Sequence, residues 1–533
     1  MCKNRILVDG LFVVLCMAMV FSIMENAAAE LRPVVMLVPY LISYCLIRVL
    51  FCLNYKWSNV ALVAVITVLC IKELYEGYTQ LFMFFGKKNG QDFCIGSFSN
   101  SGLYGCFLAV CSSMFVACCA KEKNRYIKIA FISLSVLSLL LLPVTMSRAS
   151  VLSFAAAVLL LFFSIEQYRL FLHRNWIILS VLIMLFATGA YIIKKPSADG
   201  RMLMNRIGLR IIKKNGLNSA GVGYYAGAYG AEQCAYFSEF VGDKDDDMGI
   251  NNIPEGIRMV ADSPYYAFNE YLKVGVEYGL VSVLLLIALV VIGIVTSYKS
   301  GSCWCYPLLT LSVFALFSYP FETKIFSYMF TAFLASAGNN ENNKVLNVTF
   351  YCLIVFVASI HLNKERRRID NIQICSCQYD SNNLFVSQPN IYVVKDLLTG
   401  SDAIVDQNAF FNYGQAYNMS GDYNRSDSIL KIGATVSSDP MFWNVMGNNS
   451  LALGNYREAE KRYRHAFYMV PNRLYPLYLL AKLYHTEGDT VQFLKMADLV
   501  ESFIPKVESV NTERLRNEIA GIKDCYLKDI SIE

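Results

Sequence analysis

Long apolar runs recur through the first two thirds of the chain, and polar stretches separate them. A hydrocarbon core requires about 20 apolar residues per helix. Eleven runs approach that length, at 6–24, 33–53, 59–82, 101–120, 127–146, 149–166, 176–194, 273–297, 303–321, 325–338 and 345–362. The pattern predicts an all-α protein whose residues 1–362 form a polytopic membrane bundle of about 11 transmembrane helices.

Two polar segments interrupt or follow this pattern. Residues 195–272 form a long insertion between two predicted spans, and a loop of that length is usually either functional or disordered. Residues 363–405 are rich in Asn, Ser, Asp and Gln and predict a linker. Residues 406–533 then become periodic.

The period of this C-terminal tail is close to 34 residues. Gly-Asp-Tyr at 421–423, Gly-Asn-Tyr at 454–456 and Gly-Asp-Thr at 488–490 fall where helix hairpins would turn. The middle copy fits the tetratricopeptide pattern at Trp443, Gly447, Gly454, Tyr456, Ala459, Tyr463, Ala466 and Pro471. Such a spacing predicts a helical solenoid resembling tetratricopeptide repeats, which bind a protein partner or serve as a structural cap.

Composition agrees with a membrane protein. Hydrophobic residues make up 55% of the 533 positions, 17% are charged and the mean hydropathy is +0.40. Lys and Arg concentrate in alternate short connections, which places the N-terminus in the cytoplasm. Eleven crossings then place residues 195–272 and the tail outside the cytoplasm. The run Arg366-Arg367-Arg368 argues for an even number of crossings instead.

Several kinds of chemistry are excluded or unsupported. The chain has no P-loop, dinucleotide fingerprint, nucleophile elbow or paired Cys-x-x-Cys motif. Its four histidines, at 173, 361, 465 and 485, all lie outside the 195–272 loop, which excludes histidine-based metal or triad chemistry there. Most of the 17 cysteines lie in apolar runs, where they act as small hydrophobes. We expect no metal, no cofactor and no nucleic-acid partner.

The loop begins with a basic helix. Asp199 is a candidate N-cap for a helix over 201–214. Helical spacing places Arg206, Arg210, Lys213 and Lys214 on one face, either solvated or facing lipid headgroups. Arg201 lies on another face among apolar side chains, where a cation requires a phosphate or a structural carboxylate as partner.

Two further charges stand at predicted span ends. Arg148 joins the fifth and sixth spans and is either functional or a snorkelling anchor. Glu270 precedes the eighth span and is either a capping charge or a site carboxylate.

Four motifs carry a resemblance over roughly residues 60–300. They are the Gly-Ser-Phe-x-Asn stretch at 96–100, Ser147-Arg148, Gly200-Arg201 followed by Gly221-x-Gly223, and Asn269-Glu270-Tyr271-Leu272. With these motifs in this order, the chain resembles the O-antigen ligase superfamily, which includes O-antigen polymerases and protein O-oligosaccharyltransferases.

The resemblance implies a function in the inner membrane of a bacterium. Such enzymes transfer a glycan from an undecaprenyl-diphosphate carrier to lipid A-core, a growing glycan or a protein hydroxyl on the periplasmic face, without nucleotide or metal. It implies that Arg201 is catalytic and that Arg148, Arg201 and Arg210 bind the diphosphate. Many ligases have a histidine at the position of Phe268 as a candidate base. Here either Glu270 or another carboxylate takes the proton, or the mechanism depends on positioning of the acceptor, or this member lacks the usual activity.

Other interpretations stay open at this point. An O-antigen polymerase would share the same fold. A membrane transporter or assembly protein without enzymatic activity would use the repeat tail to recruit partners, although a transporter typically has inverted repeats and charges at mid-membrane.

Overall fold

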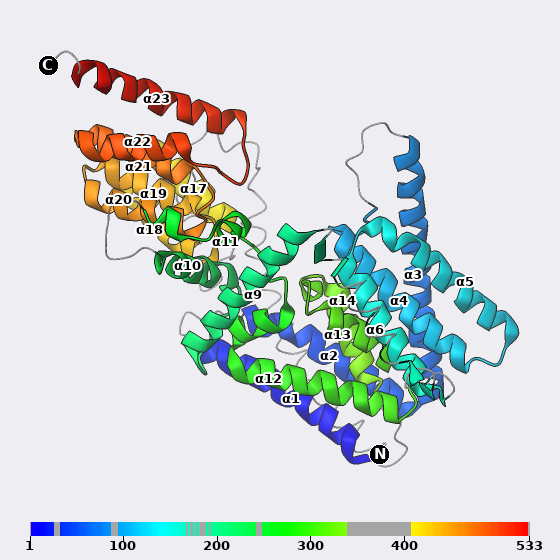
Figure 1. Cartoon of the computed structure of the whole chain (residues 1–533). Helices are drawn as coiled ribbons and strands as arrows, with labels where there is room; N and C mark the ends of the chain where they lie inside the picture. The colour runs from blue at the N-terminus through cyan, green and yellow to red at the C-terminus, as the bar shows by residue number, and fades with distance from the viewer. Residues whose placement is uncertain are drawn as a thin grey trace. The chain divides into compact units, whose positions relative to one another are not determined.

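The structure is a computed structural model that describes residues 2–25, 32–86, 94–240, 248–337 and 407–530, apart from scattered positions between 167 and 193. The described residues form helices joined by turns and irregular loops, and no strand occurs among them (Figure 1). The chain divides into two compact units, one within Met1–Ile193 and Phe268–Ile369 and one within Lys194–Ala267 and Asp370–Glu533.

The first unit is a bundle of apolar helices. They are α1 (Cys2–Glu25), α2 (Arg32–Leu53), α3 (Tyr55–Gly86), α4 (Ser101–Lys121), α5 (Arg125–Leu141), α6 (Arg148–Ser164), α12 (Glu270–Lys299), α13 (Cys305–Phe314) and α14 (Lys324–Ala335). Four described helical segments are long and apolar enough to cross a membrane: Tyr55–Met83, Ser101–Lys121, Arg125–Thr145 and Glu270–Lys299. This character is that of a membrane protein.

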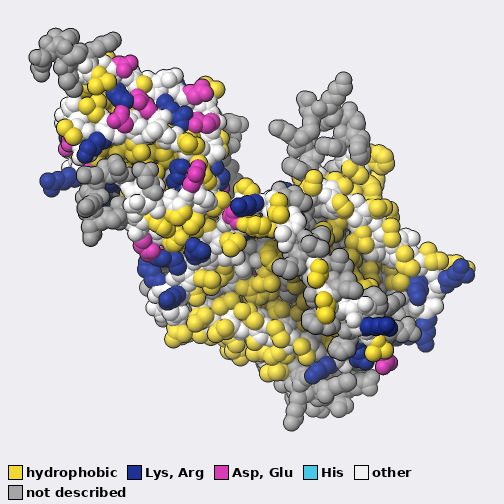
Figure 2. Space-filling view, viewed as in Figure 1, with side chains coloured by type: hydrophobic (Ala, Val, Ile, Leu, Met, Phe, Trp, Pro, Cys, Tyr) yellow, Lys and Arg dark blue, Asp and Glu magenta, His cyan; other side chains and the backbone are white. Residues whose placement is uncertain are grey.

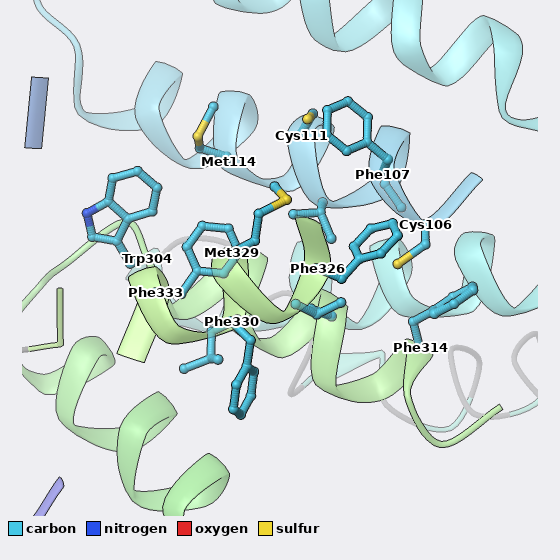
Figure 3. Packing of buried hydrophobic residues seen from close by; sticks show 14 of the residues in the cluster. Cys106, Phe107, Cys111, Met114, Trp304, Phe314, Phe326, Met329, Phe330 and Phe333 are labelled. Carbon is cyan, nitrogen blue, oxygen red and sulfur yellow. The ribbon is translucent and has the colours of Figure 1, made fainter. Parts of the chain in front are cut away.

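Helix α4 forms the centre of the bundle, and it is buried over most of its length. Figure 3 shows Cys106, Phe107, Cys111 and Met114 on one side of the cluster, and Trp304, Phe314, Phe326, Met329, Phe330 and Phe333 around them. The rings of Trp304 and Phe333 stack with their centroids 5.6 Å apart. Because lipid is as apolar as these side chains, close packing rather than exclusion of water favours their association in a membrane.

Large apolar side chains also cover the outside of this unit. Phe21 is 70% exposed on α1 and Phe82 is 76% exposed on α3, and similar side chains line α5 and α12. Figure 2 shows hydrophobic side chains spread over this surface, whereas acidic and basic side chains intersperse on the repeats. An apolar exterior of this extent is suited to contact with lipid.

The region predicted as two spans at 303–321 and 325–338 is broken into shorter pieces. Helix α13 has 10 residues and α14 has 12, which at 1.5 Å per residue gives roughly 15 and 18 Å. Between them the chain leaves the helical conformation, and the backbone N–H of Glu270 donates to Ala315 O at 2.9 Å. Hydropathy predicted one continuous helix over 303–321; this prediction was wrong because the carbonyl of Ala315 bonds to α12 instead. All of the predicted span 345–362, most of 176–194 and the linker 363–405 lie outside the described residues.

One buried charge pair fixes the end of α14. Arg48 is fully buried, and its Nη2 lies 2.8 Å from Asp9 Oδ1. Its Nη1 donates to Ala335 O at 2.5 Å and to Ala337 O at 3.0 Å, where α14 leaves its last carbonyls without helical partners. The guanidinium therefore joins α1, α2 and α14 inside the bundle.

The second unit combines the loop with the tail. The loop contributes α9 (Lys195–Asn215), α10 (Tyr225–Ser238) and α11 (Glu255–Val260). The tail contributes α17 (Gln407–Met419), α18 (Tyr423–Val436), α19 (Met441–Ala452), α20 (Tyr456–Met469), α21 (Tyr475–Glu487), α22 (Thr490–Ser502) and α23 (Val510–Ile530). Sequence had grouped the loop with the bundle, whereas its helices pack on those of the tail.

The tail helices pair in succession, α17 with α18, α19 with α20 and α21 with α22. Gly421, Gly454 and Gly488 stand at the three hairpin turns with φ of +82°, +74° and +82°, a conformation that favours glycine. In the middle pair a Cβ at Gly447 would lie 2.3 Å from the ring of Tyr463. A small residue at this position therefore lets α19 and α20 approach closely.

Candidate functional site

The Gly-Ser-Phe-x-Asn stretch is held rigidly before α4. Gln80 Oε1 accepts from the N–H groups of Ile95 and Gly96 at 2.9 Å each, and the buried Glu73 carboxylate accepts from Ser97 N at 3.1 Å. Gly96 has a φ of +58°, and a Cβ there would lie 2.6 Å from the ring of Tyr104. Only glycine fits this turn, which explains the first residue of the motif.

Asn100 connects this stretch with the segment before α12. Its Oδ1 caps α4 by accepting from Leu103 N at 2.9 Å, and its Nδ2 donates to the hydroxyl of Tyr319 at 2.6 Å. The ring of Tyr319 meets the ring of Phe268 edge to face, with centroids 5.1 Å apart. The first motif and the residue that precedes the fourth motif therefore meet on Tyr319, a residue that the sequence did not indicate.

The Ser147-Arg148 motif contacts the same end of α4. Ser147 Oγ caps α6 by accepting from Ser150 N at 3.3 Å, and Ser150 Oγ donates to Gly102 O at 3.4 Å. A Cβ at Gly105 would lie 2.8 Å from Ser150 Oγ, so a glycine is required for this approach. Arg148 is the first residue of α6 and is half-buried.

Glu270 opens α12 and supports the break between α13 and α14. Asn269 caps α12 by accepting from Tyr271 N at 3.1 Å. The Glu270 side chain is 2% exposed, and its Oε1 accepts from Phe321 N at 2.7 Å. Lys273, one turn later, pairs with Glu277 at 3.8 Å and also with Glu322. Glu270 thus bonds to the backbone of the neighbouring segment, whichever further role it has.

Three helix N-termini therefore converge in the first unit. The first turns of α4 and α6 touch directly, and Asn100, Tyr319 and Phe268 connect α4 to the start of α12. A helix N-terminus carries partial positive charge, so such an arrangement favours an anion, phosphate above all. Arg148 adds a full positive charge at one of the three ends.

In the second unit, α9 begins earlier than the sequence predicted. The helix starts at Lys195 with a proline in its first turn, so Asp199, predicted to be the N-cap, lies inside the helix. Proline is well suited to the first turn because its fixed φ matches the helix. Arg201 is half-buried, and the neighbouring Gly200 packs against Val260 at the end of α11.

The basic face of α9 is split between two environments. Arg210 Nε donates to Glu232 Oε1 at 2.8 Å, Arg210 also pairs with Glu239, and Lys214 Nζ lies 3.2 Å from Glu232 Oε2. Hydrogen bonds to Glu239 and Glu232 raise the pKa of Arg210, and the hydrogen bond from Arg210 lowers the pKa of Glu239. The partners of Arg210 are structural carboxylates of α10. Arg206 is exposed.

Two glycines of α10 allow the loop to pack closely against the tail. A Cβ at Gly227 would lie 1.8 Å from Thr435 O, and one at Gly230 would lie 2.7 Å from Met469. The preceding turn contains Gly221 and Gly223, both with positive φ, as the motif Gly221-x-Gly223 requires. The glycine-rich stretch thus allows a close approach to the tail backbone.

Helix α11 is anchored on the tail by polar contacts. Asn472 Nδ2 donates to Arg258 O at 2.9 Å and to Ala261 O at 2.7 Å. Arg258 in turn donates to Ile504 O at 3.2 Å and lies over the ring of Phe503. Helices α10 and α11 both pack against α9, so the tail sets the position of the helix that carries Arg201.

A cavity of about 440 Å³ opens beside α10 in this unit. It is lined by Ala220, Tyr224, Gly227, Ala228, Ala231, Lys431, Ala434, Thr435, Trp443 and Met446. The Trp443 ring contacts His465 in a tilted arrangement, with centroids 3.8 Å apart, and His465 Nδ1 lies 3.4 Å from Cys234 Sγ. Burial raises the pKa of the Cys234 thiol to about 12 and, with Lys461, lowers the pKa of His465 to about 4.

The predicted site residues fall into both units. Arg148 and Glu270 belong to the first unit, and Arg201 and Arg210 belong to the second. Sequence reasoning missed Glu73, Gln80, Tyr319 and Glu232. Glu73 had a visible signal, because it is a charge inside the apolar run 59–82. Glu232 had one too, because it and the C-cap residue Glu239 are seven residues apart on one face of a helix otherwise rich in Ala and Gly.

Comparisons of the chain with protein-family models, with curated proteins and with solved structures found no match.

Proposed function

We propose that this protein is a membrane glycan transferase of O-antigen ligase or protein O-oligosaccharyltransferase type, acting in the inner membrane of a bacterium. The observation that supports this most is the convergence of the N-termini of α4, α6 and α12. The segments that meet there, 96–100, 147–148 and 269–272, are three of the four on which the resemblance rests.

In this proposal the donor is a glycan on undecaprenyl diphosphate. The acceptor hydroxyl oxygen forms a bond to the anomeric carbon, while the bond from that carbon to the diphosphate oxygen breaks. The lipid diphosphate departs with the electron pair, and a base takes the hydroxyl proton. Arg148 and the three helix N-termini stabilise the charge that develops on the diphosphate. The role of Arg201 as a further cation rests on the resemblance alone.

The base in this scheme is Glu270. Phe268, at the position of the family histidine, has no atom that accepts a proton, and its ring packs against Tyr319. The buried Glu270 carboxylate uses Oε1 to hold Phe321 N. Oε2 is left to accept the proton. Arg210 has a positioning role here, because Glu232 and Glu239 bind its guanidinium.

The topology that accompanies the proposal has eleven crossings, with the loop and a tetratricopeptide-like tail outside the cytoplasm. Support comes from the second unit, because one compact body made of loop and tail must lie on one side of a membrane. The chain between them then crosses an even number of times.

Deletion of the gene in the native host, followed by complementation, tests the proposal. We expect the deletion to change the lipopolysaccharide or glycoprotein ladder, and Arg148→Ala and Arg201→Ala to restore it roughly 100-fold less well than the unaltered chain. Arg125→Ala, at an exposed arginine at the start of α5, is the matched control and should restore the ladder fully. Equal membrane levels of each variant are checked by immunoblot.

The same experiment separates the alternatives. Loss of long chains with retention of a single repeat unit would identify a polymerase. Unchanged ladders in the deletion strain, or full rescue by both arginine variants, would reject the transferase proposal in favour of a transporter or assembly protein.

A further inference from the structure

Helix α9 presents a mixed apolar and basic face to its surroundings. Lys195, Met202, Arg206, Leu209 and Lys213 follow helical spacing and form one stripe along the helix. All five are exposed, Met202 by 63% and Leu209 by 58%. Two large apolar side chains on the same exposed face as three cations form a distinct surface, which we call the α9 stripe.

The α9 stripe is exposed because the opposite side of α9 is the one that packs against the rest of the unit. Leu203, Ile207 and Ile211 are buried on that side, and α9 packs there against α10 and α11. Arg210 and Lys214, at its edge, are neutralised by Glu232 and Glu239. The fold therefore determines which of the basic residues of α9 remain available.

The charge of the α9 stripe is not balanced within its own helix. Asp199 is the single acidic residue of α9, and it is half-buried. Among the described residues, no carboxylate forms an ion pair with Lys195, Arg206 or Lys213, and Arg206 donates to the hydroxyl of Tyr236 at 3.1 Å. The complementary surface must therefore be both anionic and able to accept apolar side chains.

We propose that the α9 stripe docks on the surface of a bilayer that contains anionic phospholipids. Met202 and Leu209 enter the boundary between headgroups and acyl chains, while the long basic side chains reach the phosphates. The helix starts at Lys195, directly after the apolar run 176–194, so the stripe begins where a predicted span ends. This inference does not depend on glycan transfer.

Photo-crosslinking in the full-length protein tests this docking directly. Benzoylphenylalanine replaces Leu209 in one variant and Leu453 in another, and the protein is reconstituted in nanodiscs of phosphatidylcholine with or without phosphatidylglycerol. Leu453 is the matched control, because it is an exposed leucine at the end of α19. We expect lipid adducts, detected by mass spectrometry, at position 209 and few at position 453.

Charge removal then tests the preference for anionic lipid. Arg206→Gln with Lys213→Gln should reduce the excess of phosphatidylglycerol adducts at position 209 by roughly fivefold per charge. Salt of about 0.5 M should have a similar effect, since it shortens the Debye length to about 4 Å. Arg457→Gln with Lys461→Gln, two exposed basic residues of α20, should leave the adducts unchanged.

Three outcomes would overturn the inference. The first is equal lipid adduct yield at positions 209 and 453. The second is crosslinking of position 209 to protein in place of lipid, which would identify a protein interface. The third is a phosphatidylglycerol preference that survives Arg206→Gln with Lys213→Gln.

Discussion

The helices of the two units pack in different surroundings, because the exterior of the first unit is apolar and that of the second is charged. In the first unit apolar side chains lie both inside and outside, and the fully buried guanidinium of Arg48 bonds to Asp9 and to the end of α14. In the second unit the outside is charged, and polar contacts such as Asn472 to the carbonyl of Ala261 join loop to tail. Polar groups thus specify position in both units.

In both units, glycines allow two helices to approach closely. Gly293 of α12 would place a Cβ 2.7 Å from Leu334, and Gly227 of α10 would place one 1.8 Å from Thr435 O. Where lipid offers no hydrophobic driving force, close approach increases the contact between helices. In the second unit the same approach orients α10, and with it the carboxylates that hold α9.

The strongest test of the comparison is to break the buried pair of the first unit. Arg48→Ala leaves Asp9 and the last carbonyls of α14 without their cation, and we expect a loss of about 3–5 kcal/mol. The midpoint of unfolding by SDS, measured on purified protein, reports this loss. Arg125→Ala, at an exposed position, should change stability by less than about 0.5 kcal/mol. Equal effects of the two substitutions would show that the pair does not hold α14.

The second test separates the loop from the tail. Gly227→Ala forces α10 away from the backbone at Thr435, and we expect the second unit to lose about 3 kcal/mol, the upper range for overpacking. Limited proteolysis of the turn at 216–224 should become faster while the first unit is unaffected.

Gly256→Ala is the matched control for this substitution, because no atom lies within 4 Å of a Cβ there. Alanine also favours a helix by up to about 1 kcal/mol over glycine. If Gly227→Ala and Gly256→Ala are equally resistant to protease, the glycine contact does not secure the loop.

The third test is a dependence on pH in the second unit. Burial, with Lys461 nearby, lowers the pKa of His465 to about 4, whereas an unfolded histidine has a pKa of about 6.5. The unfolded chain takes up the proton at a higher pH than the folded chain does. The free energy of unfolding therefore has its full value above pH 6.5 and decreases by at most about 3 kcal/mol as the pH falls toward 4.

Thermal unfolding between pH 7 and pH 4.5 measures this decrease. The variant His465→Gln has no proton to bind, so the part of the slope due to His465 should disappear. A slope that is the same in both proteins would assign the effect to other groups.

The local patterns of the sequence were informative, whereas contacts between distant segments were not. The turns at Gly421, Gly454 and Gly488 could be placed because the required backbone conformation favours one residue type. The helical spacing of Arg206 and Lys213 likewise put them on one face. These features depend on neighbours in the chain alone.

The partners across the fold depend on topology and were therefore missed. The carbonyl acceptor at Thr435 that requires Gly227 lies in the tail, and a glycine-rich stretch looks the same whether a ligand or a backbone approaches it. Tyr319 joins Asn100 to Phe268, although hydropathy assigned it to a continuous span. Arg148, Arg201, Arg210 and Glu270 could be named as candidates from the sequence, but the side chains and carbonyls that they contact could not.

The second unit is discontinuous in the chain, and this imposes an order on its biogenesis. Its first part, Lys194–Ala267, leaves the ribosome before any repeat helix exists, and residues 268–406 must be made in between. Domains generally fold as units during synthesis, with N-terminal segments first. Helix α10, which packs against the helix that carries Arg201, therefore has no tail helix to pack against until α18 and α20 have been synthesised. A nascent chain stalled before residue 423 would therefore hold its loop unfinished and exposed to proteases and chaperones.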